Sequence, residues 1–422
     1  MRYRIDQKTG RSLSVLGLGC MRFPRTIAGI DMKKAEAIVM TAIEQGVNYF
    51  DTAWIYPGSE EALGIILEKN RVRDRVYIAS KLPAMLVKKP GDLDRFFNEE
   101  LGRLRTDRID YYLIHNLADL FSWETLVSLG IEEWIAAKKK NGRPGGGDNG
   151  SGPGGGGSGR SGGGGSGGIG QIGFSFHGPA GEFHKILAAY PWEFCQIQYN
   201  YSDEHFQAGV EGLRKAAETM PVIIMEPLLG GKLANGLPTE ALDIFHAFSP
   251  DESPAAWGLR WVWNHGEAAV VLSGMNDPAQ VAENAALADR AAAGSLTAEE
   301  LDLYRRVREV FNASYKIHCT GCGYCMPCPR GVNIPGCFAA YNTSFVMDWR
   351  TGFQQYLNGT GISSAKNAGP AACVSCGACE GHCPQRLPVM AALKTVRRRL
   401  EPLPVRVLLA AARRFMGRKG ER

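Results

Sequence analysis

Short apolar runs alternate with segments of helical period along most of the chain, and this alternation restricts its fold more than any other feature. Between residues 14 and 290 the pattern predicts eight strands, each bounded by turn residues. They are predicted at Val15–Gly19, Val47–Asp51, Val76–Lys81, Ile109–His115, Ile172–Ser175, Phe194–Gln198, Val222–Glu226 and Ala269–Ser273. Continuously apolar strands indicate a parallel sheet covered on both faces. Eight strand–helix units therefore predict an α/β protein with a (β/α)8 TIM barrel.

Helical periodicity marks the segments between these strands. Helices are predicted at Met32–Glu44, Glu60–Glu68, Leu93–Leu104, Ser122–Lys140, Glu211–Met220 and Ala279–Ala288. A doubly wound sheet is the alternative, but no GxGxxG motif follows the first strand. Residues 144–168 contain 16 glycines in 25 positions, a composition typical of flexible coil. Because a helix and a strand flank this tract, we interpret it as an insert in one loop of the barrel.

Cysteines are concentrated near the C-terminus, where nine of the eleven lie between Cys319 and Cys383. They form two runs, Cys319-x2-Cys322-x2-Cys325-x2-Cys328-Pro329 and Cys373-x2-Cys376-x2-Cys379-x3-Cys383-Pro384. This spacing is close to the bacterial ferredoxin pattern for 4Fe–4S clusters. A zinc site is the alternative, but Cys₄ zinc sites typically use two CxxC pairs without a third cysteine at the same gap. The sequence predicts two 4Fe–4S clusters in a small α-helical ferredoxin-like domain.

The ligands of each cluster follow from the rule that the fourth cysteine of a run serves the other cluster. One predicted set is Cys319, Cys322, Cys325 and Cys383, and the other is Cys328, Cys373, Cys376 and Cys379. The first run has two residues before its last cysteine where three are usual, so Cys337 is an alternative to Cys328. We favour Cys328 because Pro329 follows it. Outside this region, Cys20 is expected to pack at the rim of the barrel.

Four polar residues lie at or just after the ends of three consecutive predicted strands: Asp51, Tyr56, Lys81 and His115. The C-terminal ends of the strands form the active site of a TIM barrel. A phenol is a poor acid at neutral pH, but a neighbouring ammonium stabilises the phenolate and a carboxylate holds the ammonium in place. The phenol can then protonate a carbonyl oxygen, which an imidazole orients. The alternatives are a structural Asp–Lys pair and a histidine satisfied in the core, but chance does not readily place all four residues at consecutive strand ends.

These residues lie in motifs with a family resemblance. Asn48-Tyr49-Phe50-Asp51-Thr52-Ala53 with Tyr56, then Ser80-Lys81, then Tyr112-Leu113-Ile114-His115 resemble the aldo-keto reductases over about residues 10–290. The resemblance implies a catalytic tetrad of Asp51, Tyr56, Lys81 and His115, with Tyr56 as general acid. Together with the cysteine runs, it is closest to the subfamily that carries a C-terminal ferredoxin-like domain.

The same resemblance implies a nicotinamide dinucleotide, NADP or NAD. Its implied contacts are Ser175, Gln198, Tyr199 (as the stacking ring), Glu226, Leu228, Gly230, Lys232, Ser273, Gly274, Gln280 and Asn284. Many members of the family carry a basic residue where Asn276 stands here, and that residue pairs with the 2′-phosphate of NADP. Its absence leaves the choice between the two dinucleotides open.

The chain is predicted to divide into a barrel at 1–295, a linker helix with the iron–sulfur domain at 296–400, and a basic tail at 401–422. The linker helix is expected at Thr297–Asn312, with Thr297 and Glu300 forming a capping box.

Positive charge is concentrated near the C-terminus, where residues 386–422 hold eleven Lys and Arg against two Glu. Because the whole chain has a net charge of +5, the rest of it is mildly acidic, which disfavours nucleic-acid binding. Residues 404–416 form a predicted cationic amphipathic helix, which either docks on the protein itself or contacts an anionic partner or membrane surface.

The sequence predicts an NAD(P)H-dependent oxidoreductase that acts on a small carbonyl substrate, with clusters that relay electrons to or from a partner protein. The alternative is an electron-transfer or redox-sensing protein whose barrel only docks a nicotinamide or a partner. Hydride transfer moves two electrons together whereas a cluster takes one, so the role of the clusters stays open between electron relay, a flavin or radical step, and a structural or sensing role.

The sequence shows no signal peptide and no transmembrane stretch, which predicts a cytoplasmic protein.

Overall fold

A computed structural model describes residues 1–141, 167–360, 368–403 and 405–406. The predicted tail helix at 404–416, except for residues 405 and 406, lies outside this description. So does the predicted insert at 144–168, except for residues 167 and 168.

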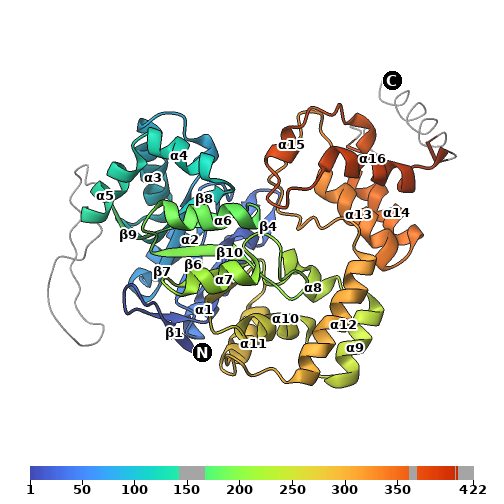
Figure 1. The fold of residues 1–422 in the computed structure, drawn as a ribbon, viewed down its shortest axis with the longest axis horizontal. Coiled ribbons are helices and arrows are strands. Elements are labelled where there is room, and N and C mark those ends of the chain that lie inside the picture. The colour runs from blue at the N-terminus through green and yellow to red at the C-terminus, as the bar shows by residue number, and fades with distance from the viewer. Residues whose placement is uncertain (142–166, 361–367, 404, 407–422) are drawn as a thin grey trace. The chain divides into compact units, whose positions relative to one another are not determined.

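The centre of the first part of the chain is a closed barrel of eight strands, as predicted (Figure 1). All neighbouring strands in it are parallel. In chain order the strands are β3 (Leu16–Gly19), β6 (Tyr49–Asp51), β7 (Tyr77–Leu82), β8 (Arg108–Leu117), β9 (Gly168–Phe176), β10 (Phe194–Gln198), β11 (Val222–Met225) and β12 (Ala268–Ser273). Since parallel strands end at the same edge, this closure brings all eight C-terminal ends to one mouth.

Helices follow the strands and shield the outer face of the barrel. They are α1 (Met32–Glu44), α2 (Ser59–Lys69), α3 (Gly91–Leu104), α4 (Leu120–Ser128), α5 (Ile131–Asn141), α6 (Ala180–Ala189), α7 (Gly209–Ala217), α10 (Pro254–Trp263) and α11 (Pro278–Ala288). The prediction of one helix over Ser122–Lys140 was wrong. Two helices occupy this segment, because the chain turns at Gly130, whose φ of 81° is a left-handed conformation that glycine adopts without strain.

Strand β9 begins earlier than predicted. Gly168, the last residue of the predicted insert, pairs with Arg108 in the sheet, and Ile169 pairs with Ile109. The apolar pattern identified only the central part of this strand, because glycines at 168 and 170 carry no hydrophobic signal. A Cβ at Gly170 would lie 2.5 Å from the backbone oxygen of Asp110, so close packing against β8 requires glycine there.

A plug of large side chains fills the N-terminal end of the barrel. The antiparallel hairpin of β1 (Tyr3–Ile5) and β2 (Ser12–Ser14) lies at this end. The hydroxyl of Tyr111 donates a hydrogen bond of 2.8 Å to the buried carboxylate of Asp6. Tyr49, Tyr111 and Phe194 pack together in the same interior cluster. The residues of this plug show which positions of each strand point into the barrel. Two residues further along a strand, the next inward-pointing position lies at the mouth.

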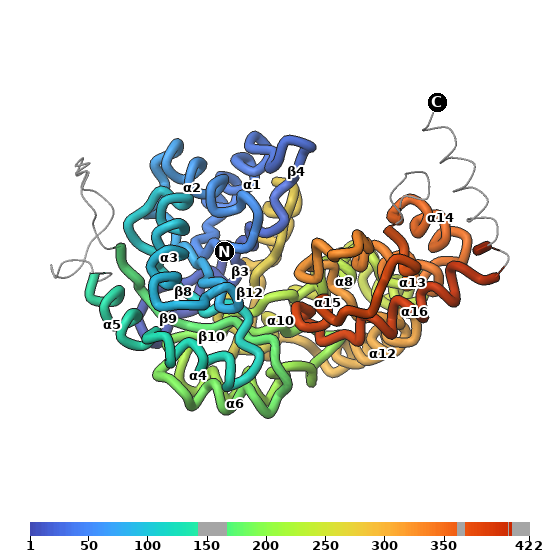
Figure 2. The backbone as a smooth tube through the Cα atoms, turned by 90° about the horizontal axis from the view of Figure 1, so that it is seen from above, coloured from blue at the N-terminus to red at the C-terminus, as the bar shows by residue number. Residues whose placement is uncertain are grey.

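The described chain forms two compact units. The first comprises residues 1–199, 203–227 and 259–295, and the second comprises 200–202, 228–258 and 296–422 apart from the undescribed residues. The second unit contains α8 (Lys232–Asn235), α9 (Thr239–Phe248), α12 (Ala298–Ser314), α13 (Ile334–Val346), α14 (Trp349–Thr360), α15 (Ala378–Gly381) and α16 (Val389–Leu400). Helices α13, α14 and α16 lie together in it (Figure 2).

The predicted linker helix is confirmed as α12, with the capping box of Thr297 and Glu300 at its start. The limits of the predicted functional domains stay predictions. Among the described residues, none of the helices combines the length and the apolar character needed to cross a membrane.

The contact between α2 and α3 depends on Gly64. A Cβ there would lie 2.3 Å from the backbone oxygen of Arg103, so Gly64→Ala must push the two helices apart. We expect this substitution to lower the free energy of unfolding by about 1–3 kcal/mol in denaturant titration. Gly102→Ala is the matched control on α3, because nothing lies within 4 Å of its Cβ. It should stabilise the helix by about 0.5–1 kcal/mol. Equal effects of the two substitutions would contradict this packing.

Candidate functional site

A buried ion pair lies at the mouth of the barrel. Lys81, near the end of β7, places its Nζ 2.6 Å from Oδ1 of Asp51, the last residue of β6. The same nitrogen donates a hydrogen bond of 2.7 Å to the backbone oxygen of Thr52. The side chains of Lys81 and Asp51 are only 1% and 6% exposed. The ammonium is thus held in place by two oxygens in a site from which water is largely excluded.

Tyr56 and His115 complete the cluster, so the structure brings all four predicted side chains together. Nζ of Lys81 lies 5.1 Å from the centre of the Tyr56 ring. The Tyr56 and His115 rings are 6.0 Å apart and meet edge to face at 84°. Tyr56 comes from the loop between β6 and α2, whereas His115 lies on β8. The phenol therefore sits between an ammonium and an imidazole.

Burial shifts the pKa values of the ionisable side chains in this cluster. It raises the pKa of Asp51, although the Lys81 charge opposes that shift. The pKa of His115 is well below its ordinary value, first because the ring is buried and then because of the nearby charges of Lys81 and His177. His115 is consequently a neutral imidazole at neutral pH, able to donate one hydrogen bond and accept another.

A bulge interrupts β8 directly beside His115. The register with β9 shifts between Ile114 and Leu117, and Asn116 has a φ of 59°. The backbone N–H of Asn116 donates a hydrogen bond of 2.8 Å to the hydroxyl of Ser175 on the neighbouring strand, which holds the bulge in place. Such bulges redirect a side chain beside an active site. Neither the apolar pattern nor the motif of this strand indicated the bulge.

A row of polar side chains continues around the mouth on β9 and β10. Gly173 pairs with Leu113, which belongs to the interior plug, so the positions two and four residues later also point inward. These are Ser175 and His177, and Ser175 pairs with Gln196 on β10. Ser175 and Gln198 were predicted, whereas His177 and Gln196 were missed. Counting every second residue along β9 and β10 from the interior plug would have identified both.

Two further predicted dinucleotide contacts, Tyr199 and Glu226, directly follow β10 and β11. The Tyr199 ring is fully buried and packs 4.9 Å from Trp261 and 5.1 Å from His265, counted from ring centres. It therefore offers no exposed face for stacking in this structure. Glu226 follows β11 directly and has a left-handed φ of 56°.

The loop after β12 and the start of α11 bring four more predicted residues together. Nδ2 of Asn284 lies 3.4 Å from the hydroxyl oxygen of Ser273, and Gln280 accepts a hydrogen bond of 3.1 Å from the N–H of Asn276. A Cβ at Gly274 would lie 2.9 Å from Cδ of the exposed Arg22, so glycine allows this arginine to approach. Arg22 is a cation beside this loop that the sequence analysis did not single out.

Three predicted contacts belong to the second unit, in a tight turn that leads into α8. Leu228 precedes this turn, in which Gly230 and Gly231 have φ values of 68° and 91°. Lys232 begins α8, and its Nζ lies 5.2 Å from the centre of the Tyr315 ring. Both positions have a left-handed backbone conformation, which glycine adopts without strain, so the shape of the turn accounts for the two glycines.

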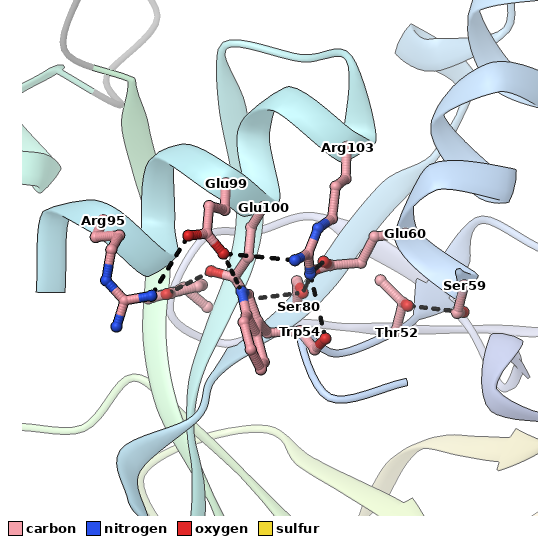
Figure 3. Close-up of polar contacts among 10 residues, drawn as sticks. Thr52, Trp54, Ser59, Glu60, Ser80, Arg95, Glu99, Glu100 and Arg103 are labelled. Carbon is pink, nitrogen blue, oxygen red and sulfur yellow. Dashed lines mark hydrogen bonds and ion pairs between the residues drawn. The ribbon is translucent and has the colours of Figure 1, made fainter. Parts of the chain in front are cut away.

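Behind Lys81, on the outer face of the barrel, two buried glutamates share one hydroxyl (Figure 3). Oγ of Ser80 lies 2.5 Å from Oε1 of Glu60 and 3.2 Å from Oε1 of Glu100. Tyr112 donates a hydrogen bond of 2.6 Å to Glu100, and Arg103 donates one of 3.1 Å to Glu60. Burial raises the pKa of both carboxyls, and the charge of Glu60 raises that of Glu100 further. A pocket of about 290 Å³ beside this network is lined by Tyr56, Glu60 and Arg103, among others.

In the second unit, the cysteines line two separate pockets. Cys319, Cys322, Cys325 and Cys383 line one, and Cys328, Cys373, Cys376 and Cys379 line the other. Ile334 lines both, so the two pockets share a wall. Four thiols around each pocket suit a cubane cluster, whose irons take one thiolate each. Within the described residues, no group of three or more His, Cys, Asp or Glu is spaced to hold a single metal ion.

The other cysteines are buried. Cys337 lies on α13 in the apolar core of the second unit and is absent from the lining of either pocket. Cys20 is fully buried next to the tetrad, and burial together with the charge of Asp51 raises the pKa of its thiol.

The chain matches the sequence profile of the Aldo/keto reductase family over residues 15–307, which is more than half of its length. Residues 318–387 match the profile of a 4Fe-4S dicluster domain. Two curated relatives are similar over a segment only: a D-galacturonate reductase of Fragaria ananassa (33% identical over 111 residues) and an aldo-keto reductase of Mycobacterium sp. strain MCS (34% over 112). These matches cover 25% and 26% of this chain and span only 33% and 36% of the relatives' own lengths.

Solved structures show the same fold. An aldo-keto reductase from Bacillus halodurans in its holo form is 22% identical with a TM-score of 0.55, over 73% of this chain and 96% of that one. An aldo/keto reductase from Klebsiella pneumoniae in complex with NADP and acetate gives the same four values. At this identity the likeness concerns the fold alone.

The buried glutamate pair predicts a pH-dependent stability. The raised pKa of Glu100 means that the folded protein keeps a proton which the unfolded chain releases above its ordinary pKa of about 4.3. Folding is therefore disfavoured progressively as the pH rises above that value. Glu100→Gln has no proton to lose and can still accept the hydrogen bond from Tyr112. In denaturant titrations, its stability relative to the unsubstituted protein should increase from pH 4 to pH 8. A relative loss that grows with pH would contradict this assignment.

Proposed function

The chain belongs to the aldo/keto reductase family and carries a 4Fe–4S dicluster domain, and from that premise we propose that it interconverts a carbonyl compound and an alcohol with a nicotinamide dinucleotide. The observation that carries the proposal is the convergence of Asp51, Tyr56, Lys81 and His115 at one mouth. The bound dinucleotide would supply or accept the hydride.

The four side chains have distinct roles in this proposal. The hydroxyl of Tyr56 donates its proton to the carbonyl oxygen while the hydride reaches the carbon, which completes the alcohol. Lys81 stabilises the phenolate that remains, and Asp51 keeps the ammonium oriented. The neutral His115 donates a hydrogen bond to the carbonyl oxygen and so fixes its direction. In the reverse direction the same phenolate accepts the proton of the alcohol.

We propose that the dinucleotide lies across the mouth. Ser175 and Gln198 are inward-facing polar groups of the kind that bind a carboxamide. Within the first unit, the further contacts proposed from the family pattern are Glu226, Ser273, Gly274, Gln280 and Asn284. The contacts expected at Leu228, Gly230 and Lys232 stay predictions. The NADP bound to the Klebsiella relative supports NADP as the first dinucleotide to test, and Arg22 beside Gly274 provides a cation for a phosphate. Stacking by Tyr199 stays a prediction.

We also propose that the eight cysteines of the two pockets hold two 4Fe–4S clusters, which exchange single electrons with a redox partner protein. The grouping of thiols in each pocket matches the crossed ligand sets expected from their spacing. Cys328 lines a pocket and Cys337 packs in the core, which supports Cys328 as the ligand. A small carbonyl compound and an electron-transfer partner are therefore the proposed partners.

Tyr56→Phe tests the role of the phenol. This variant keeps the ring but removes the proton donor, so carbonyl reduction should fall by at least about 100-fold while NADPH binding is retained. Turnover is followed by NADPH oxidation with a panel of aldehydes, and binding by fluorescence titration. Tyr77→Phe is the matched control, because Tyr77 lies at the opposite end of β7 from the mouth. Undiminished turnover of Tyr56→Phe would refute the proposal.

Iron analysis tests the ligand sets. Anaerobically prepared protein should contain about eight iron and eight acid-labile sulfide per chain. Cys379→Ala removes one ligand of a proposed set, and the iron content should fall toward about four. Cys337→Ala should keep the full amount, because Cys337 lines neither pocket. Loss of iron in Cys337→Ala with retention in Cys328→Ala would reverse the assignment of the fourth ligand.

A further inference from the structure

One of the two cysteine-lined pockets of the second unit reaches the surface. Of the eight cysteines that line the two pockets, Cys376 is exposed, whereas the other seven are half-buried. Cys376 belongs to the pocket that Cys328, Cys373 and Cys379 also line. Because a cysteine ligand is bonded directly to its cluster, an exposed ligand offers a short path for an electron between the cluster proposed there and a molecule in solution.

The surface around this pocket combines exposed apolar groups with positive charge. Val374, which lines the pocket, is 56% exposed. Pro329 and Arg330 also line it and are exposed. Lys394 is exposed as well, and it lies one turn of α16 after Met390, another lining residue. Two cations thus adjoin the pocket beside apolar groups that a partner could cover.

The same part of the chain carries little negative charge to offset these cations. Residues 318–400 contain eight Lys and Arg, but their only acids are Asp348 and Glu380. The Asp348 carboxylate accepts hydrogen bonds from two backbone N–H groups at the start of α14. The Glu380 carboxylate accepts one of 2.9 Å from the N–H of Met390. Both acids therefore have local partners, and the positive field would speed the approach of a negatively charged protein at low salt.

We propose that this surface, formed by Pro329, Arg330, Val374, Cys376 and Lys394, is the docking site of a small acidic one-electron carrier protein. The inference rests on the electron-transfer role proposed above. Each encounter oxidises the carrier by one electron and reduces the second unit by one, or the reverse, and no bond is made or broken.

The size and charge of this surface suit a transient protein encounter. Electron-transfer encounters bury less than about 1,200 Å² in total, so a few exposed residues with charges at their edge are sufficient. An anionic membrane is a poorer match, because each cation near such a surface contributes only about 1 kcal/mol. Arg330 and Lys394 alone would give weak attachment to it.

Calorimetric titration of the cluster-loaded protein tests the docking site. An acidic plant-type 2Fe–2S ferredoxin serves as the carrier, and it should bind more weakly as salt is added. We expect Arg330→Glu to weaken this binding by about tenfold at low salt, since the reversal replaces an attraction with a repulsion. Arg350→Glu on α14 is the matched control, because it changes the net charge equally at an exposed residue that does not line the pocket.

Two results of this titration would overturn the inference. One is that the unsubstituted protein does not bind the ferredoxin. The other is that the two substitutions weaken binding equally, because net charge alone would then account for the effect. Vesicles of anionic phospholipid are titrated in parallel. If they bind as tightly as the ferredoxin and Arg330→Glu abolishes their binding, the surface belongs to a membrane and the carrier proposal is wrong.

A rate measurement separates docking from an effect on the clusters. Reduced ferredoxin and reduced methyl viologen, a small cation, are each mixed with oxidised protein, and the cluster absorbance is followed by stopped flow. Arg330→Glu should slow reduction by ferredoxin about tenfold but should not slow reduction by methyl viologen. Slowing of both would assign the effect to the clusters and contradict docking.

The two measurements also distinguish this inference from the proposed electron transfer. If the protein holds no clusters but binds ferredoxin through Arg330, the electron transfer fails and the docking site stands. If methyl viologen reduces the clusters but ferredoxin does not bind, the clusters stand and the docking site is refuted.

Discussion

The ion pair of Lys81 and Asp51 is the interaction on which the chemistry proposed for this barrel depends. An ammonium that is 1% exposed is stable only with close partners, because removing it from water costs several kcal/mol. The carboxylate of Asp51, at the end of the adjacent strand, and the backbone oxygen of Thr52, just after that strand, provide those partners. The fixed charge then acts on every group around it. Together with burial, which is the larger cause, it lowers the pKa of His115 and of His177. Burial and one cation thus keep two imidazoles neutral.

The residues at the ends of the strands could be predicted from the sequence, because the end of an apolar run marks the end of a buried strand. Asp51 and Lys81 end apolar runs, and in a closed parallel barrel such positions meet at one edge. The cysteine grouping was predictable for a similar reason, since its spacing reflects the size of a cluster. In both cases the spacing of residues along the chain, combined with a general rule for the fold or the cluster, indicates which distant residues meet.

Other features depend on tertiary contacts that leave no local signal. The bulge at Asn116 is held by Ser175, which lies 59 residues away, and the helix break at Gly130 depends on a single left-handed residue. The buried environment of Tyr199 is created by Trp261, from a helix far along the chain. His177 falls between these cases. Its inward direction follows from alternation along β9, but only once the plug shows which positions face the interior.

The chemistries proposed for the two units differ in the number of electrons moved at a time. The proposed carbonyl reduction needs a hydride and a proton together, whereas each thiol-lined pocket of the second unit suits a one-electron carrier. The shared wall at Ile334 brings the two pockets next to each other, so a pair of clusters there could store two electrons in succession. A store of that size matches the two electrons of one hydride. Two clusters in the second unit, as proposed, would together hold the number of electrons that one hydride carries, which gives the proposal of two clusters a physical reason.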